Sequence, residues 1–220
     1  MSTPAVNDAQ ASRIGRPATD LLWVVGGFAL LLLSALPVHQ HSISAFETSV
    51  FRALNDRTVV PFVVIWPVMQ LGNFLVVPIT AAIAAVMRRF RLAVGILLGG
   101  VVTYYLAKVV KGIVVRGRPS SLLDDVHIRG AAAGGRGYIS GHAAVVTFIA
   151  LLAWPYLNRT GRIIAVVLVT VVCLARVYVG AHLPLDVVGG VGLGLAVGGA
   201  VRLLTGRPVS AGQPSEGASR

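Results

Sequence analysis

The sequence predicts an all-α integral membrane protein with six transmembrane helices and a short interfacial helix after the first span. Of its 220 residues, 55% are hydrophobic and only 12% are charged, about half the charged share of an ordinary soluble domain. The apolar residues fall in runs of roughly 20, long enough to cross a bilayer. This apolar content excludes an intrinsically disordered chain. The single cysteine, Cys173, excludes a disulfide scaffold and a cysteine-based metal site.

The first two apolar segments differ in length and pattern. Residues 21–38 form a run long enough to span, and no small-residue cleavage site precedes the polar His39. An uncleaved helix is therefore expected rather than a signal peptide. Within residues 43–54, apolar side chains recur near helical spacing between charged ones, which is typical of a helix lying in the membrane interface. An ordinary loop helix would show the same pattern.

The remaining apolar runs complete the count of six spans. Three prolines, Gln70 and Asn73 interrupt residues 59–87, which predicts one kinked crossing or a span preceded by a segment at the membrane surface. Lys108 and Lys111 lie near the end of the next predicted span. A polar, glycine-rich connection then precedes three further runs. The ranges for these elements are 92–115 for the span, 116–140 for the connection, and 143–157, 163–179 and 183–204 for the last runs.

Six crossings place both termini on one side of the membrane. Basic clusters around Arg88 and Arg159 fall on that side, which favours cytoplasmic termini. We expect a multi-pass protein of the cell membrane whose helical domain, residues 20–205, lies between disordered tails, 1–19 and 206–220. Other arginines fall on the extracytoplasmic side, where we expect an anionic substrate. The net charge of +11 does not indicate nucleic acid, because no soluble region is large enough to bind it.

The first segment with candidate functional residues closes the predicted span 92–115. Lys111 is followed, after six residues, by Arg118 and Pro119. The proline restricts the backbone that carries the arginine. By themselves, these cations are also what the flank of a membrane span commonly carries.

The second segment opens the helix predicted after the polar connection. Ser140 is a good N-cap, and Gly141 allows a ligand to approach the backbone closely. The free amide groups and the positive end of the helix together attract anions. His142 follows immediately and could donate a proton to an anion bound at that position.

The third segment joins the last two predicted spans. Arg176 is followed after five residues by His182, and after three more by Asp186. Pro184 suits the first turn of a helix, which places the aspartate within reach of the imidazole. A carboxylate that holds one ring nitrogen leaves the other free as a nucleophile, and the arginine offers a planar fork to phosphate oxygens. A structural His–Asp pair is the alternative, but charged groups in a membrane are usually functional.

Together, the three segments resemble the phosphatidic acid phosphatase type 2 (PAP2) superfamily. Its signature is Lys-x6-Arg-Pro, Pro-Ser-Gly-His and Ser-Arg-x5-His-x3-Asp on a six-helix membrane core, and the resemblance covers about residues 92–190. It implies a PAP2-type bundle in which His182 attacks phosphorus, Asp186 orients His182 and His142 protonates the leaving oxygen, without metal or cofactor. The resemblance implies that the phosphoryl group is bound by Lys111, Arg118, Pro119, Ser140, Gly141 and Arg176.

Two positions depart from this signature: Ile139 stands where the family usually has proline, and Ala175 where it usually has serine. The lost hydroxyl is worth about 1 kcal/mol, so we expect altered phosphate affinity or substrate preference. The expected function is hydrolysis of a lipid phosphate or diphosphate through a phosphohistidine. The substrate would be a polyprenyl diphosphate, phosphatidylglycerol phosphate or phosphatidate in the bilayer. The alternatives are a lipid phosphotransferase using the same site and a non-enzymatic lipid or ion transporter. The second phosphate of a diphosphate substrate could contact Arg116, Arg129 and Arg136, which lie in the polar connection. The sequence does not indicate an oligomeric state.

Overall fold

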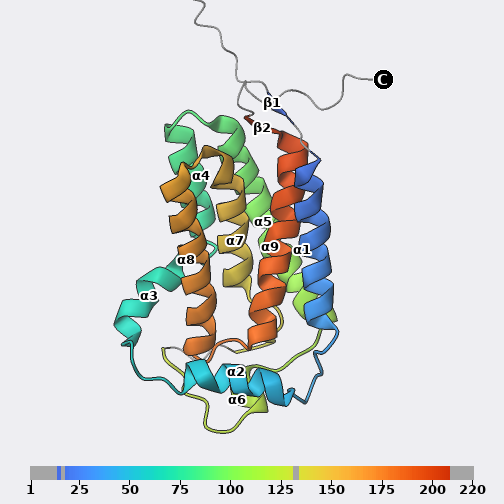
Figure 1. Ribbon diagram of the computed structural model, residues 1–220, viewed down its shortest axis with the longest axis vertical. Coiled ribbons are helices and arrows are strands. Elements are labelled where there is room, and N and C mark those ends of the chain that lie inside the picture. The colour runs from blue at the N-terminus through green and yellow to red at the C-terminus, as the bar shows by residue number, and fades with distance from the viewer. Residues whose placement is uncertain (1–13, 16–17, 131–133, 209–220) are drawn as a thin grey trace, which may run out of the picture.

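Six helices run side by side and form the body of the molecule (Figure 1). The computed structural model describes residues 14–15, 18–130 and 134–208. Helix α7 continues into a 3-10 turn, η1 (Trp154–Tyr156). The six helices are α1 (Thr19–Ala35), α4 (Val76–Val86), α5 (Phe90–Ile113), α7 (Gly141–Ala153), α8 (Arg159–Tyr178) and α9 (Pro184–Thr205).

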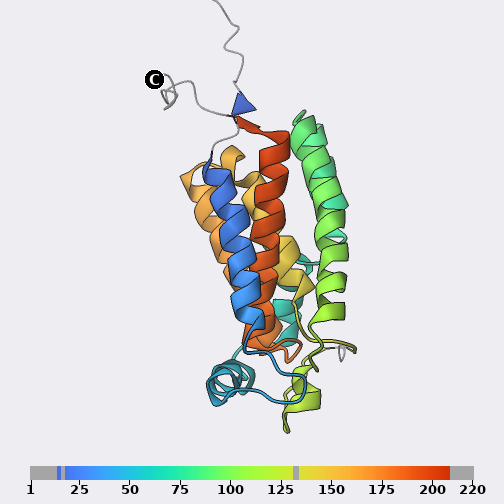
Figure 2. The same cartoon turned by 90° about the vertical axis from the view of Figure 1, so that its right-hand side faces the viewer.

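The shorter elements lie at or near the two ends of this bundle. Helix α2 (Ala45–Asn55) lies across one end, with the one-turn helix α6 (Pro119–Leu122) beside it, and α3 (Phe62–Gln70) leaves the bundle at its side (Figures 1 and 2). At the other end, β1 (Ile14–Gly15) pairs antiparallel with β2 (Arg207–Pro208). The predicted disordered tails, 1–19 and 206–220, lie mostly outside the described residues. The parts of them that are described include these two short strands.

Within the part of the chain that the structure describes, three helices, α5, α8 and α9, are long and apolar enough to cross a membrane. The apolar helices Thr19–Ala35, Val76–Val86 and Gly141–Tyr156 are shorter. Large apolar side chains stay exposed on the outside of the bundle, as on Leu22 and Ile163, which suits contact with lipid rather than water. Each of the six predicted spans thus contains an apolar helix of the bundle, while six complete crossings remain a prediction.

Residues 59–87 form two helices instead of one long kinked one. The chain breaks after Gln70, and only α4 runs with the bundle, which corresponds to the alternative of a preceding segment followed by a span. The side-chain oxygen of Asn73 accepts a hydrogen bond from the amide of Leu75 at 3.1 Å, and such a bond favours a turn over a continuous helix. A short helix also forms where 43–54 predicts one, beginning after the N-cap Ser44.

Helix α9 lies at the centre and contacts α1, α5, α7 and α8. Glycines permit the close approach: a Cβ on Gly192 would lie 2.6 Å from the amide nitrogen of Leu31 in α1, and small residues serve the same purpose in membrane helix pairs generally. On another face, a Cβ on Gly190 would overlap the carbonyl oxygen of Ser140. The central helix therefore holds the start of α7 directly against its own first turns.

Candidate active site

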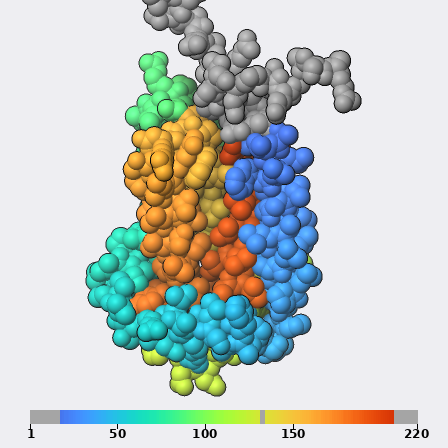
Figure 3. All heavy atoms as spheres, in the orientation of Figure 1, coloured from blue at the N-terminus to red at the C-terminus, as the bar shows by residue number. Residues whose placement is uncertain are grey.

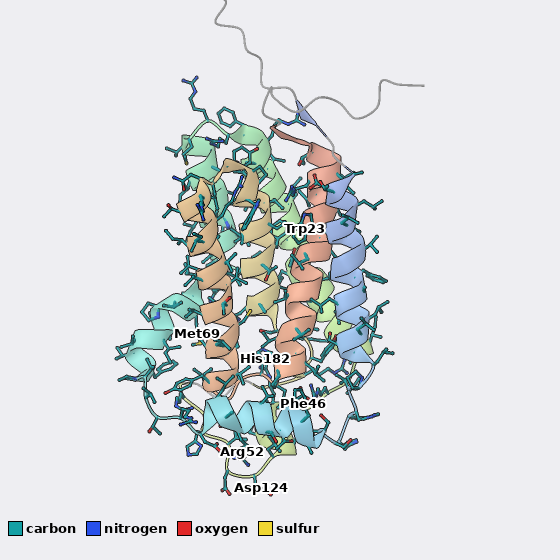
Figure 4. The ribbon with its side chains drawn as sticks, viewed as in Figure 1. Trp23, Phe46, Arg52, Met69, Asp124 and His182 are labelled. Atoms are coloured by element: carbon teal, nitrogen blue, oxygen red, sulfur yellow. The ribbon has the colours of Figure 1, made fainter. Side chains whose placement is uncertain are left out.

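The three motif segments meet at the end of the bundle that α2 covers, and each is hydrogen-bonded to the other two. Lys111 of α5 donates to the carbonyl of Ile139. Ser140 donates from its amide to the carbonyl of Asp186 at 2.8 Å, and Arg118 Nη1 donates to the carbonyl of Ala181 at 2.6 Å. Figure 4 shows His182 at this end, between the bundle and α2. Segments far apart in the chain thus form one site.

The geometry around His182 defines which ring nitrogen carries the proton. Its Nε2 lies 3.3 Å from Nη1 of Arg118, and a guanidinium can only donate. The Nε2 atom must therefore accept, which leaves the proton on Nδ1. That nitrogen faces Oδ2 of Asp186 at 3.5 Å, a contact longer than a good hydrogen bond. The lone pair of Nε2 consequently points toward the cations of the site.

His182 is 3% exposed. Burial, and then the neighbouring guanidiniums of Arg176 and Arg118, hold the pKa of His182 well below its usual range. Both influences disfavour the charged imidazolium. The imidazole is therefore neutral at physiological pH, the state in which a histidine is a nucleophile.

Two arginines of the site, Arg118 and Arg176, have a buried Nε without a hydrogen bond and no carboxylate partner among the described residues, whereas Arg116, whose Nε is also unpaired, binds two carboxylates through its Nη atoms. Arg176 Nη1 meets only the sulfur of Met69, at 3.6 Å. Among the described residues, neither Arg118 nor Arg176 forms an ion pair with a carboxylate, and neither does Lys111. All three cations are half-buried, and partly buried positive charge without a carboxylate partner favours the binding of an anion.

The start of α7 supplies a further feature of the site. Ser140 is its N-cap, and the hydroxyl accepts from the amide of Ala143 at 3.4 Å. Nothing lies within 4 Å of a Cβ built on Gly141, so the helix N-terminus opens onto free space. His142 follows at the same helix start, within electrostatic range of Arg118, Arg176 and His182.

Arg118 is the N-cap residue of α6, and the buried Pro119 is the first residue of that helix. Proline at this position is favourable because its missing N–H would be unpaired there anyway. The two departures from the signature are both buried in apolar packing. Ile139 lies in the core between α5, α7 and α9, and Ala175 packs with Met69 and Tyr178.

A cavity of about 170 Å³ opens beside Arg176. Its other wall is α3, which contributes Phe62, Trp66 and Met69. Figure 4 shows Met69 on α3 beside α8. The cavity therefore joins an apolar wall to one of the cations without an ion-pair partner.

Arg116 is not available to a second phosphate, contrary to expectation, and Arg129 binds backbone carbonyls although it also lines the cavity beside Arg176. Arg116 is 1% exposed, and its Nη1 donates to Oε1 of Glu47 and Oδ1 of Asp186, both at 3.0 Å. The guanidinium of Arg129 donates to the carbonyls of Tyr178, Asn55 and Arg57. Both cations neutralise or bind groups of the protein itself. Arg136 is exposed and donates to the carbonyl of Lys111 at 3.0 Å.

Glu47 belongs to the site although the sequence analysis does not single it out. It is 3% exposed and lies in the first turn of α2, more than 60 residues before the first motif. The only local signal is an acidic residue in a segment whose apolar side chains recur at helical spacing. Its partner, Arg116, lies 69 positions away, so the pairing depends on the tertiary fold.

Comparisons with known proteins find a matching family and several similar proteins. The model of the PAP2 superfamily matches residues 89–208. An undecaprenyl-diphosphatase of Sulfolobus acidocaldarius is 26% identical over 118 residues, which are 54% of this chain and 57% of that protein. The match therefore spans little more than half of that relative.

Two crystal structures have a similar fold. LpxE of Aquifex aeolicus superposes with a TM-score of 0.68 at 22% identity, covering 74% of this chain and 98% of that one. The first transmembrane PAP2-type phosphatidylglycerolphosphate phosphatase, from Bacillus subtilis, also gives 0.68, at 25% identity, and covers 81% and 93%.

Proposed function

Because this chain belongs to the PAP2 superfamily, we propose that it is an integral membrane phosphatase that hydrolyses a lipid phosphate or diphosphate. The observation that carries the proposal is that three cations, Lys111, Arg118 and Arg176, which pair with no carboxylate among the described residues, all act electrostatically on His182, with Arg118 in contact with its Nε2. Phosphoryl transfer spreads negative charge over three equatorial oxygens, so prearranged cations give most of the catalytic help.

In the first step, Nε2 of His182 attacks phosphorus and the bond to the leaving oxygen breaks. Arg118 now donates to Nε2, so it transfers its hydrogen bond to a phosphate oxygen when substrate binds. The developing imidazolium keeps its proton on Nδ1, facing the Asp186 carboxylate. Burial and the charges of Arg176 and Arg118 disfavour a protonated His142 in the free protein. When the substrate's phosphate offsets those charges, His142 takes up a proton and gives it to the leaving oxygen, and the product lipid departs.

In the second step, water attacks the phosphohistidine and the P–N bond breaks. His142, which lost its proton in the first step, accepts one from the attacking water. Inorganic phosphate leaves, and both histidines return to their starting states. The protein's own cations stabilise the charge in both steps, so the proposed reaction requires no metal.

The substrate is a phosphorylated lipid within the bilayer, of the polyprenyl diphosphate, phosphatidylglycerol phosphate or phosphatidate type. Two relatives support this range by name, an undecaprenyl-diphosphatase and a phosphatidylglycerolphosphate phosphatase. The cavity beside Arg176, with its apolar α3 wall, suits a phosphate attached to a hydrophobic group.

The arrangement of the bundle supports cytoplasmic termini and an extracytoplasmic site in a multi-pass protein of the cell membrane. The two described chain ends pair at one end of the bundle, and the site lies at the other (Figure 1). Arg88 and Arg89, which connect α4 to α5, and Arg159, the first residue of α8, lie at the end with the termini. Arg89 stacks there on the ring of Tyr156, 4.6 Å from its centroid. Positive charge in short connections marks the cytoplasmic side.

The test measures phosphate release by the purified protein in detergent, with a chelator present, from a panel of lipid phosphates. We expect release by the wild type and by His127→Ala, a control at an exposed histidine. Release should fall at least about 10³-fold in His182→Ala. Equal release by His182→Ala would exclude its role as nucleophile, and loss of activity with chelator would exclude the metal-free reaction. Phosphate found on a second lipid would identify a phosphotransferase instead, and no phosphate transfer at all would favour a transporter.

A further inference from the structure

A buried chain of charges connects α2 to the site. Arg116 binds both oxygens of Glu47 through its two Nη atoms, and its Nη1 also donates to Asp186 Oδ1 at 3.0 Å. The exposed fractions of Glu47, Arg116 and Asp186 are 3%, 1% and 0%. Figure 3 shows α2 covering this end of the bundle. One arginine thus holds two carboxylates from different elements out of contact with water.

Glu47 also completes the N-terminus of α9. The N-cap residue of α9 is Leu183, whose side chain offers no hydrogen-bond acceptor. Instead, Oε1 of Glu47 accepts from the amide of Leu185 at 2.9 Å, and Oδ2 of Asp186 accepts from the amide of Leu183 at 2.9 Å. A carboxylate from α2 therefore binds a free amide that the helix itself leaves unpaired. His182 directly precedes this capped turn.

These contacts determine how Asp186 faces His182. Arg116 occupies Oδ1, and the Leu183 amide holds Oδ2, which is the oxygen that faces the imidazole Nδ1 at 3.5 Å. We propose that Arg116 and Glu47 are positioning residues, which hold the Asp186 carboxylate and the start of α9 so that His182 Nε2 points at the phosphoryl group. This inference rests on the proposed function for its kinetic consequence. The arrangement of His182 itself can be tested without turnover.

The proposal predicts that a second substitution restores part of the activity that Arg116→Met loses. In Arg116→Met, two buried carboxylates remain near each other without their shared cation, and their repulsion displaces Asp186. Adding Glu47→Gln removes one of the two charges, while the amide oxygen can still accept from Leu185. The double variant should therefore be more active than Arg116→Met alone. A role confined to stability predicts instead that the unfolding temperature differs among the variants while kcat per folded molecule stays at the wild-type value.

The kinetic test compares these variants with Arg116→Lys and a matched control, Arg202→Lys. Arg202 is similarly buried and pairs with Asp20 at 2.6 Å, at the other end of the bundle. We expect kcat to fall at least about tenfold in both Arg116 variants, with KM within about threefold of wild type, because phosphate contacts remain. Arg202→Lys should keep its kcat. If Arg116→Met fails to fold, Arg116→Lys and Glu47→Gln are compared with wild type instead. A double variant no better than Arg116→Met, or an equal loss in Arg202→Lys, would overturn the proposal.

The second measurement is nitrogen NMR of protein labelled at its histidines, with the His182 signals assigned by their loss in His182→Asn. We expect wild type to show one tautomer, protonated on Nδ1, and Arg116→Met to show a mixture that Glu47→Gln returns toward a single form. An unchanged tautomer in Arg116→Met would overturn the inference. If the tautomer shifts as expected but wild type releases no phosphate from any lipid, the proposed function fails and the positioning role stands.

Discussion

Replacing Arg176 by methionine should stabilise the free protein while removing phosphate binding. The Nε atom of this arginine is buried without a partner, and Nη1 meets only the Met69 sulfur at 3.6 Å. A buried donor without a partner costs about 1–3 kcal/mol. The low end of this range applies to Arg176 because the residue as a whole is only half-buried. A gain of about 1 kcal/mol corresponds to a rise of about 2–4 °C in Tm for a chain of this size.

The same substitution should weaken substrate binding, because hydrogen bonds to charged groups contribute about 1.5–3 kcal/mol each. Loss of one or two such bonds lowers kcat/KM by about 10- to 10⁴-fold. The assay is thermal unfolding in detergent with and without inorganic phosphate, followed by turnover of the best lipid. Phosphate should raise the Tm of wild type but not of Arg176→Met.

The matched control is Arg202→Met, which removes a buried arginine that has an anion partner, Asp20. Breaking such a pair costs about 3–5 kcal/mol, so its Tm should fall. The reasoning about cations without an ion-pair partner would be refuted if Arg176→Met also lowered the Tm, or if phosphate stabilised this variant as strongly as wild type.

Three further predictions concern pH, packing and substrate choice. Because the pKa of His182 is held well below its usual range, the unfolded chain takes up a proton near pH 6.5 that the native protein does not. The free energy of unfolding should therefore fall as the pH drops below about 6.5. Chemical denaturation at several pH values should show a shallower fall for His182→Asn than for wild type. An equal fall in both proteins would contradict a lowered pKa of His182. Gly190→Ala places a methyl group against Ser140 and should cost about 1–3 kcal/mol with reduced kcat. In Gly26→Ala the added Cβ meets nothing within 4 Å, so this variant should keep both its stability and its kcat. Comparable losses in Gly190→Ala and Gly26→Ala would exclude the close α7–α9 contact as the cause. Arg129→Ala should leave the ratio of diphosphate to monophosphate hydrolysis unchanged, because carbonyl groups already bind the Arg129 guanidinium. A loss of diphosphate hydrolysis alone would show that Arg129 binds the substrate.

Some features of this protein depend only on the local sequence, and others depend on the folded chain. Ser140 could be predicted as an N-cap because capping depends on residue type and on its place before an apolar helix. The break of residues 59–87 into α3 and α4 could not be predicted uniquely. Proline and asparagine occur both in kinked membrane helices and in turns, and the side-chain bond of Asn73 to the Leu75 amide is visible only in the folded chain.

By itself, the sequence determined the membrane character, the order of the apolar helices and the motif residues from Lys111 to Asp186. These depend on apolar run length and on short spacings along the chain. Only the tertiary structure decided which cations remain free for an anion. Arg116 and Arg118 are two residues apart in the same polar segment, yet Glu47 and Asp186 neutralise the first, while the second faces His182. The free energy of a buried charge depends on the partners that the fold brings to it, and α2 brings Glu47 to this site from a distant part of the chain.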